Sequence, residues 1–124
     1  MKPVVYIIED DDDAQSLIKT GLKKAGFDVF TYANGFPVLE MLNNWPDAFI
    51  LDIGLPGVDG FEVFKWLKAN NQARDIPVIF LSGNPELPAI AREYGVNAYL
   101  EKPFEMEDLV AKINSCLTGV NPSA

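Results

Sequence analysis

The sequence has a single cysteine, few basic side chains and no long apolar run. Because Cys116 has no second cysteine to pair with, no disulfide can form within the chain, and a reducing compartment such as the cytoplasm is expected. The longest stretch without a charged residue, Ile113–Ala124, is too short and too polar to span a membrane. The apolar stretch Val4–Ile8 is too short for a signal peptide. A cytoplasmic protein without a membrane span is therefore predicted.

Charge of one sign dominates the composition. The chain carries 18 acidic and 10 basic side chains, which gives a net charge of −8 at pH 7. Direct binding of nucleic acid by this domain is not expected, because it requires a basic face. The length of 124 residues and the apolar content of 48% suit one domain with its own core. We expect a single domain over residues 1–124, with a core over about residues 4–117 and a frayed C-terminal tail.

Five short apolar or β-branched runs alternate with segments of helical spacing. The runs predict strands at Val4–Ile8, Phe27–Tyr32, Ala48–Leu51, Val78–Leu81 and Ala98–Leu100. The helical segments are Ala14–Ala25, Pro37–Asn44, Phe61–Asn70, Ala89–Tyr94 and Met106–Leu117. This alternation predicts an α/β fold in which a parallel sheet has right-handed helical crossovers on both faces.

Charged and hydroxyl side chains follow the predicted strands at their carboxyl ends. In chain order they are Glu9, Asp10, Asp52, Ser82 and Lys102. Ligands bind at this edge of open parallel sheets, so we expect these side chains to lie close together. Carboxylates gathered there repel one another unless a cation holds them, and hard oxygen ligands suit Mg²⁺.

Two neighbouring segments support a binding site at this edge. The glycine-rich stretch Ile53–Gly60 follows Asp52 and is able to lend a backbone carbonyl to a metal. Pro103 follows Lys102, and a bond before proline can adopt the cis form at low cost. A cis bond at this point could aim Lys102 at the carboxylates. Ser82 or Lys102 by itself would carry no functional information.

Several other residues are interpreted as structural. Asp12 and Asp13 are expected to cap the N-terminus of the first helix. Gly21 inside that helix is expected to allow close packing, and Gly26 to form its C-terminal cap. Cys116 is interpreted as an inert, partly buried thiol.

Four motifs, each at the end of a predicted strand, carry a family resemblance. They are Ile7–Asp11, Leu51–Gly60, Phe80–Gly83 and Tyr99–Phe104. With these motifs in this order, the chain resembles the receiver domains of two-component response regulators, of the chemotaxis-regulator kind, over about Val4 to Leu117. The resemblance implies a flavodoxin-like, doubly wound five-stranded parallel sheet in the order 2-1-3-4-5, with five helices.

The resemblance implies a phosphorylation site at Asp52. This aspartate would accept a phosphoryl group from a histidine kinase or a histidine phosphotransfer protein. Asp10 and Asp52 would bind Mg²⁺ directly, together with the Gly54 carbonyl. Glu9 stands where aspartate is commoner and would act through a water.

The resemblance also implies how the signal is produced. Ser82 and Lys102 would bind the phosphoryl oxygens, and Tyr99 would be the switch aromatic that turns inward when Ser82 moves. The implied protein is a signalling domain of a phosphorelay rather than an enzyme, although it promotes its own phosphorylation and dephosphorylation. The sequence identifies neither the kinase nor the effector, and both a stand-alone regulator and a receiver from a longer protein are compatible with it.

The chain departs from the family pattern after the fourth strand. The span from Ser82 to Lys102 is a residue or two shorter than the family leads us to expect. Pro85 and Pro88 fall where the fourth helix should start, and proline is tolerated only in a first turn. A short or displaced fourth helix is predicted, which would alter the usual output face of fourth helix, fifth strand and fifth helix.

Other functions on the same kind of sheet need motifs that this chain lacks. A flavodoxin-like electron carrier needs a hydroxyl- and glycine-rich loop after the first strand, where Glu9–Asp13 would repel the flavin phosphate. A dinucleotide enzyme needs G-x-G-x-x-G, and a P-loop nucleotidase needs a Walker loop. A phosphatase with an aspartyl intermediate usually has a second aspartate where this chain has Gly54. A receiver-like module that is never phosphorylated is disfavoured by the complete set of polar residues.

Overall fold

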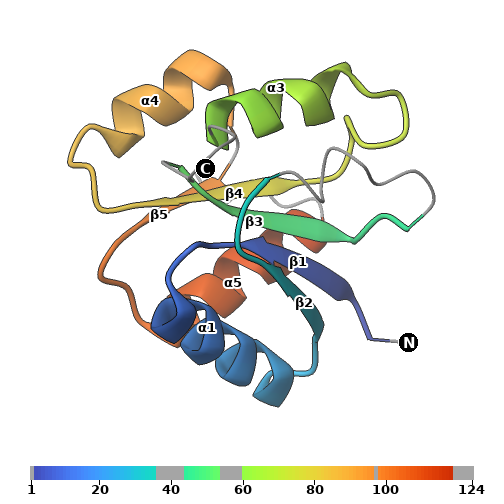
Figure 1. The fold of residues 1–124 in the computed structure, drawn as a ribbon, viewed down its shortest axis with the longest axis vertical. Helices are drawn as coiled ribbons and strands as arrows, with labels where there is room; N and C mark the ends of the chain where they lie inside the picture. The colour runs from blue at the N-terminus through green and yellow to red at the C-terminus, as the bar shows by residue number, and fades with distance from the viewer. Residues whose placement is uncertain (1, 36–43, 54–59, 97, 119–124) are drawn as a thin grey trace.

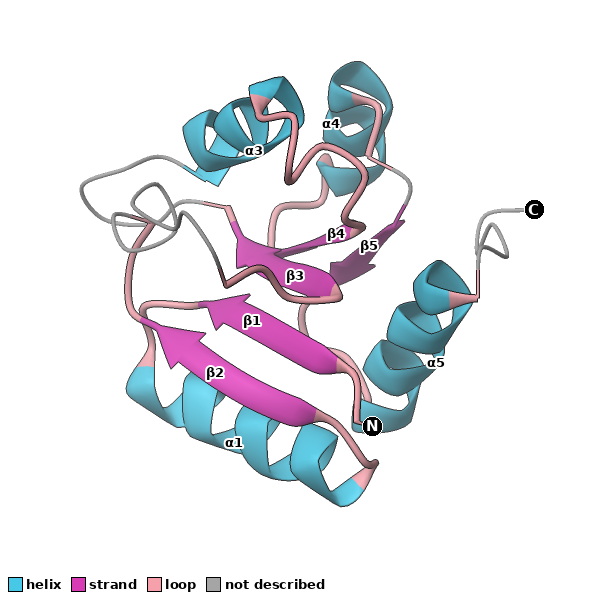
Figure 2. Cartoon of the chain, turned by 90° about the vertical axis from the view of Figure 1, so that its right-hand side faces the viewer, coloured by secondary structure: helices cyan, strands magenta, loops and turns pink. Residues whose placement is uncertain are grey.

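The fold, seen in a computed structural model, is a five-stranded sheet between two layers of helices (Figures 1 and 2). The structure describes residues 2–35, 44–53, 60–96 and 98–118. The strands are β1 (Val4–Ile8), β2 (Asp28–Tyr32), β3 (Ala48–Asp52), β4 (Val78–Ser82) and β5 (Ala98–Glu101). All neighbours pair in parallel, in the order β2-β1-β3-β4-β5. The predicted flavodoxin-like sheet and its strand order are confirmed.

Four helices lie in the described part of the chain. They are α1 (Asp12–Lys24), α3 (Gly60–Ala69), α4 (Leu87–Tyr94) and α5 (Met106–Leu117). The helix predicted over Pro37–Asn44 falls outside the described residues except at its last position. In Figure 1, α3 and α4 cover one face of the sheet, and α1 and α5 cover the other. No helix of the described segments is long and apolar enough to cross a membrane.

The core has two parts because successive side chains of a strand point to opposite faces of the sheet. One cluster faces α3 and α4, and it includes Tyr6, Ile8, Phe49, Leu51 and Phe80. The other cluster faces α1 and α5, and it includes Val5, Ile7, Ile50, Ile79 and Leu81. The central strands are thus apolar on both faces, as expected for a parallel sheet that helices cover on two sides.

The start of α1 corrects one prediction. The N-cap is Asp11, whose side chain accepts a hydrogen bond from the Ala14 amide at 2.8 Å. Asp12 and Asp13 lie in the first turn, where their charges face the positive end of the helix dipole. At the other end, Gly26 follows the helix with a φ of 100°, in agreement with the predicted glycine cap.

Helix α4 is short, as the prolines predicted. It has eight residues, with Pro88 in its first turn, and it ends at Gly95 in the left-handed conformation (φ 70°, ψ 28°). On the side facing α3, the Tyr94 ring stacks on Phe61 with centroids 4.6 Å apart and planes 11° apart. This contact joins the two helices on that face of the sheet.

The packing of α1 against α5 depends on Gly21. A Cβ atom at this position would lie 2.6 Å from Cγ and Sδ of Met106, the first residue of α5. The predicted close approach at Gly21 is therefore confirmed. Cys116 on α5 is half-buried, and burial raises the pKa of its thiol. This agrees with its interpretation as an inert thiol.

Candidate functional site

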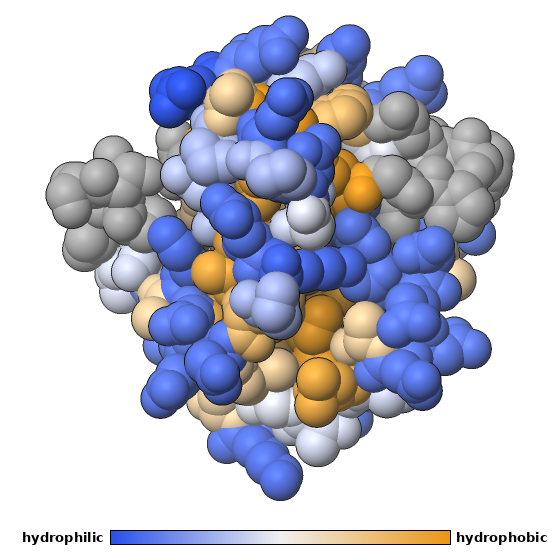
Figure 3. Space-filling view, turned by 90° about the vertical axis from the view of Figure 1, so that its left-hand side faces the viewer, coloured by the Kyte–Doolittle hydropathy of each residue, from blue (hydrophilic) through white to orange (hydrophobic). Residues whose placement is uncertain are grey.

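Strand pairing brings the predicted site residues to one edge of the sheet. Ile8 lies opposite Leu51 in the next strand, so Glu9 and Asp52 follow in neighbouring positions. Ser82 lies opposite Glu101, the residue before Lys102. Figure 3 views the molecule from the side to which the strands point. This face is mostly hydrophilic, with an apolar patch below its centre.

Glu9, Asp52 and Lys102 are in direct contact. Glu9 is 1% exposed and Asp52 is 9% exposed. The Lys102 ammonium donates a hydrogen bond to Glu9 Oε1 at 2.8 Å and another to Asp52 Oδ2 at 3.3 Å. The peptide bond between Lys102 and Pro103 is cis, the form that the sequence analysis considered. Two buried carboxylates thus share one partly exposed cation.

Backbone and side-chain contacts hold Glu9 in place. The Glu9 amide donates to the Tyr32 carbonyl at 2.9 Å, which ties the residue to β2. The Asp11 amide donates to Glu9 Oε2 at 3.3 Å, and the Gln15 side-chain amide donates to the Glu9 carbonyl at 3.1 Å. No sequence motif marks Gln15, the fourth residue of α1, as a part of the site.

The crowded carboxylates shift one another's protonation. Burial, together with the hydrogen bond and charge of Glu9, raises the pKa of Asp52 to about 7. Burial acts in the same direction on Glu9, but hydrogen bonds from Asp52, Lys102 and the Asp11 amide outweigh it and lower the pKa of Glu9 to about 2. The two carboxyl groups behave as a pair that shares one proton near neutral pH. Without a cation in addition to Lys102, the pair resists carrying two negative charges.

Three carboxylates have the geometry of a cation site. Glu9, Asp10 and Asp52 each offer an oxygen, and these oxygens lie within 4.8 Å of one another. Octahedral Mg²⁺, with ligands at about 2.1 Å, separates its ligand oxygens by about 3 to 4 Å. Small side-chain movements would therefore suffice to bring the three oxygens onto one ion. Asp10 is exposed, which leaves room for the waters that Mg²⁺ retains. Gly54, the predicted carbonyl ligand, lies outside the described residues.

Ser82 and Tyr99 lie farther along the same edge. Ser82 is 6% exposed, and its hydroxyl accepts a hydrogen bond from the Asn84 amide at 2.9 Å. The Lys102 amide donates to the Ser82 carbonyl at 2.9 Å, which links the ends of β4 and β5. Tyr99 is half-buried against the cluster under α3 and α4, with the Lys112 ammonium 5.8 Å from its ring centroid.

Gly60 has a positional role that no sequence motif indicated. A Cβ at Gly60 would lie 2.9 Å from the Asp52 carbonyl oxygen and 2.9 Å from the Ile53 Cα. Glycine thus lets the first turn of α3 pack directly against the end of β3. The sequence signal was the position of this residue at the end of the glycine-rich stretch, immediately before a helical segment.

The comparisons with known proteins agree with this geometry. The family model for the response regulator receiver domain matches residues 5–114. The transcriptional regulatory protein PrrA of Mycobacterium tuberculosis is 36% identical over 118 residues, which cover 93% of this chain and 50% of that protein. The chain spans about half the length of the first curated relatives that it matches.

Solved structures of similar proteins share the fold. A putative response regulator from Chloroflexus aurantiacus has a TM-score of 0.89 and 31% identity, covering 95% of this chain and 99% of its own. The receiver domain of a sensor histidine kinase from Pseudomonas aeruginosa has a TM-score of 0.85 and 27% identity, with the same two coverages. That structure is described with a magnesium ion coordinated in its active site cleft.

Proposed function

This chain belongs to the response regulator receiver domain family, and from that premise we propose that it is a phosphorylation-controlled switch whose phosphoryl acceptor is Asp52. The phosphoryl group comes from a phosphohistidine of a histidine kinase or of a histidine phosphotransfer protein. The 124 residues contain no histidine, so the donor has to be another molecule or another part of a longer chain. We place this exchange in the cytoplasm.

One observation supports this proposal above the others: Asp52 lies at a strand end in contact with both a cation and other acids. Its Oδ2 is 3.3 Å from the Lys102 ammonium, and it offers an oxygen within 4.8 Å of oxygens of Glu9 and Asp10. In the proposed transfer, an Asp52 oxygen attacks phosphorus while the bond from phosphorus to the donor nitrogen breaks, and the imidazole takes the electron pair. The product is an acyl phosphate, which water later hydrolyses to restore Asp52.

We propose that Asp10 and Asp52 hold one Mg²⁺ directly and that Glu9 holds it through a water. When bound, the ion neutralises negative charge on the transferred oxygens. The resemblance adds the Gly54 carbonyl as a ligand. The chemistry of the donor set supports the proposal, because three carboxylates within 4.8 Å are hard oxygen ligands that need a cation.

We assign the stabilisation of the phosphoryl group to Lys102 and Ser82. The Lys102 ammonium is already 3.3 Å from Asp52, so a small movement away from Glu9 would carry it onto a phosphoryl oxygen. Ser82 would exchange its bond with the Asn84 amide for one to another phosphoryl oxygen. The space that its movement vacates is what Tyr99, half-buried one strand away, would fill as the switch residue.

The partner has to approach the edge of the sheet where the acids lie. Helix α1 begins within the acidic run, and Leu17 in its second turn is 70% exposed. An apolar side chain this exposed, close to the end of α1 that faces the site, suits contact with the phosphohistidine donor. Leu17 is therefore the first position at which we expect a substitution to weaken donor binding and leave Mg²⁺ binding unchanged.

The proposal is tested by incubation with acetyl phosphate and Mg²⁺, followed by intact mass measurement. The wild-type chain should gain one phosphoryl group, because acetyl phosphate replaces the donor protein. Asp52→Asn should abolish this gain, and the matched variant Asp12→Asn, in the exposed first turn of α1, should keep it. Labelling that persists undiminished in Asp52→Asn would refute the assignment of the acceptor.

A further inference from the structure

Strand β2 leaves one edge of the sheet open. It is the outermost strand on its side and, among the described residues, pairs only with β1. The Asp28 amide and the Tyr32 carbonyl form hydrogen bonds toward the β1 side. Because backbone groups alternate between the two sides of a strand, the N–H and C=O groups of Val29 and Thr31 point away from the sheet. Within the described segments, two donors and two acceptors are thus available to another strand.

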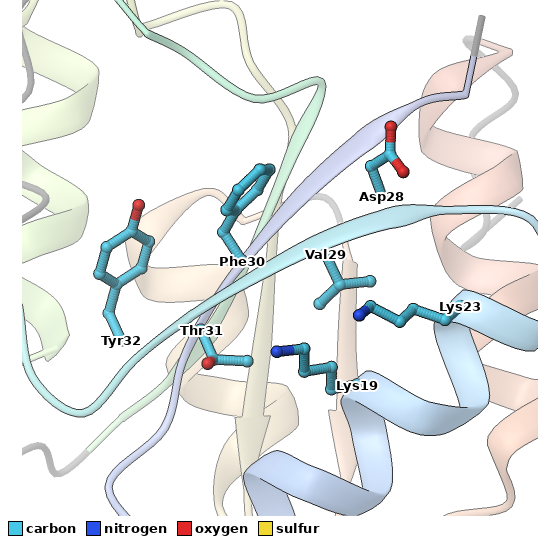
Figure 4. Close-up of a pocket in the computed structure, with 7 residues that line it drawn as sticks. All are labelled: Lys19, Lys23, Asp28, Val29, Phe30, Thr31 and Tyr32. Carbon is cyan, nitrogen blue, oxygen red and sulfur yellow. The ribbon is translucent and has the colours of Figure 1, made fainter.

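A groove follows this open edge. It has a volume of about 490 Å³ and is lined by β2 together with Lys19 and Lys23 of α1. Figure 4 shows both lysines reaching from the helix toward the strand, on the side where Val29 and Thr31 also lie. Phe30 lies on the opposite side of the strand. The groove therefore combines outward-pointing backbone groups of β2 with two ammonium groups on one side, and the Asp28 carboxylate lies on the side of Phe30.

The groove is lined by two lysines and one aspartate, Asp28, so its charge is positive whereas that of the molecule is negative. The chain has a net charge of −8, yet the salt bridges within its described parts are both made by Lys102, and none by Lys19 or Lys23. The two lysines are four positions apart in a helix, which separates them by about 6 Å along its axis. Alternate residues of a strand are about 6.7 Å apart and point the same way. Carboxylates at alternate positions of an added strand would therefore match the two lysines.

We propose that this edge groove, formed by β2 with Lys19 and Lys23, binds an extended acidic segment of a partner protein as a sixth strand. Hydrogen bonds to Val29 and Thr31 would supply affinity, and carboxylates at alternate positions would supply specificity. Lysines beside an edge strand also prevent non-specific pairing with strands of other chains. Their positive charge would make this edge selective for an acidic strand. A second copy of the chain is a poor occupant, because two-fold pairing of β2 strands would bring four lysines together.

The charge of the occupant is tested with fluorescein-labelled peptides on the full chain. The extended peptide Val-Glu-Val-Glu-Val should raise the fluorescence anisotropy on binding, and Val-Lys-Val-Lys-Val should not. The double variant Lys19→Glu/Lys23→Glu should weaken binding of the acidic peptide by roughly tenfold or more, because like charges would then face each other. The control Lys65→Glu/Arg74→Glu changes the net charge equally and should bind as the wild type does.

The backbone pairing is tested at Thr31. Thr31→Pro removes an N–H that points outward and none that bonds to β1, and proline is tolerated in edge strands. We expect this variant to keep its circular dichroism spectrum and lose peptide binding, while Thr31→Val, which keeps the N–H, binds normally. The lysine variants decide the question if Thr31→Pro does not fold.

Four results would overturn the proposal. Three concern the peptides: no binding of the acidic peptide, equal binding of both peptides, and binding of the acidic peptide that survives Lys19→Glu/Lys23→Glu. The fourth is a dimer, seen by sedimentation velocity, that persists in Lys19→Glu/Lys23→Glu but is lost in Thr31→Pro, because the edge would then pair with a second copy of the chain. None of these results depends on phosphorylation at Asp52.

Discussion

Asp52 and Glu9 show how one location makes two carboxyl groups differ. Glu9 follows β1 and Asp52 ends β3, both are buried, and burial by itself acts to raise the pKa of each. Glu9 receives hydrogen bonds from Lys102 at 2.8 Å and from the Asp11 amide at 3.3 Å, so its charge is stabilised. Asp52 is farther from the Lys102 ammonium, at 3.3 Å, and faces the charge of Glu9. The proton that the pair shares is therefore held more readily by Asp52 than by Glu9.

This difference predicts how the stability of the metal-free protein depends on pH. The pKa of Asp52 is about 7 when folded and about 3.9 when unfolded, so the folded state binds the extra proton between these values. The free energy of unfolding should fall as pH rises through that window, by about 2 kcal/mol between about pH 5 and pH 7.5. The lowered pKa of Glu9 makes the free energy of unfolding rise with pH, but only below about pH 4.5.

Urea unfolding in the presence of EDTA measures this dependence. Asp52→Asn should remove most of the fall in the free energy of unfolding between about pH 5 and pH 7.5. At the higher pH it should also stabilise the metal-free protein. Glu93→Gln, on the exposed surface of α4, makes the same charge change and should leave the fall unaltered. A fall of equal size in Asp52→Asn would assign the titration to another group.

Among the elements, α4 and the contact of α1 with α5 each depend on a few single residues. Proline in the first turn and glycine at the end confine α4 to eight residues, and the Tyr94 ring holds it against α3. Helices α1 and α5 come close because Gly21 has no side chain and Met106 fills the space above it. The short length of α4 and the close approach of α1 to α5 thus each depend on single residues, at the ends of α4 and at the contact between α1 and α5.

The contact of Gly21 with Met106 predicts non-additive substitutions. Gly21→Ala alone should destabilise the protein by about 1 kcal/mol, because the new methyl group would displace the Met106 side chain. In the Met106→Ala background the same change should stabilise by roughly 0.5 to 1 kcal/mol, since alanine is the better helix former. Denaturant unfolding of the four proteins measures the coupling. Equal effects of Gly21→Ala in both backgrounds would mean that the two residues do not compete for the same space.

At the scale of the whole molecule, the sheet order concentrates charge at one edge. Two apolar clusters occupy the two faces of the sheet, so polar side chains that follow the strands gather where the strands end. In the described part of the chain, only Lys102 forms salt bridges with the acids gathered there. The folded metal-free protein therefore stores electrostatic repulsion that a divalent cation can relieve.

Mg²⁺ should accordingly raise the melting temperature of the protein. Binding to the folded state alone stabilises by RT ln(1 + [L]/Kd), which is about 2.7 kcal/mol at roughly a hundredfold excess over Kd. Asp10→Asn should abolish the response to Mg²⁺, and Asp13→Asn, in the first turn of α1, should preserve it. Differential scanning fluorimetry with and without Mg²⁺ measures both variants. A response retained in Asp10→Asn would place the ion elsewhere.

The sequence by itself determined the fold class, the positions of the five strands and the residues that end them. These features are local: the spacing of apolar residues defines strands and helices, and proline and glycine mark their ends. The start of α1 was predicted less well, because five consecutive acids offer several possible caps and only the backbone geometry selects Asp11. The alternation of strands and helices predicts a parallel sheet, and this alone placed four residues at one edge of it: Glu9, Asp52, Ser82 and Lys102.

Only the tertiary structure decided how these residues interact. Lys102 lies 93 positions from Glu9 and 50 from Asp52, and the strand order brings all three together. Whether Lys102 binds one carboxylate or both depends on distances of a few tenths of an ångström, which no local pattern encodes. The support of Glu9 by Gln15, the close packing of Gly60 on β3 and the open edge of β2 likewise arise from the arrangement of whole elements. Their physical basis is contact between residues distant in the chain.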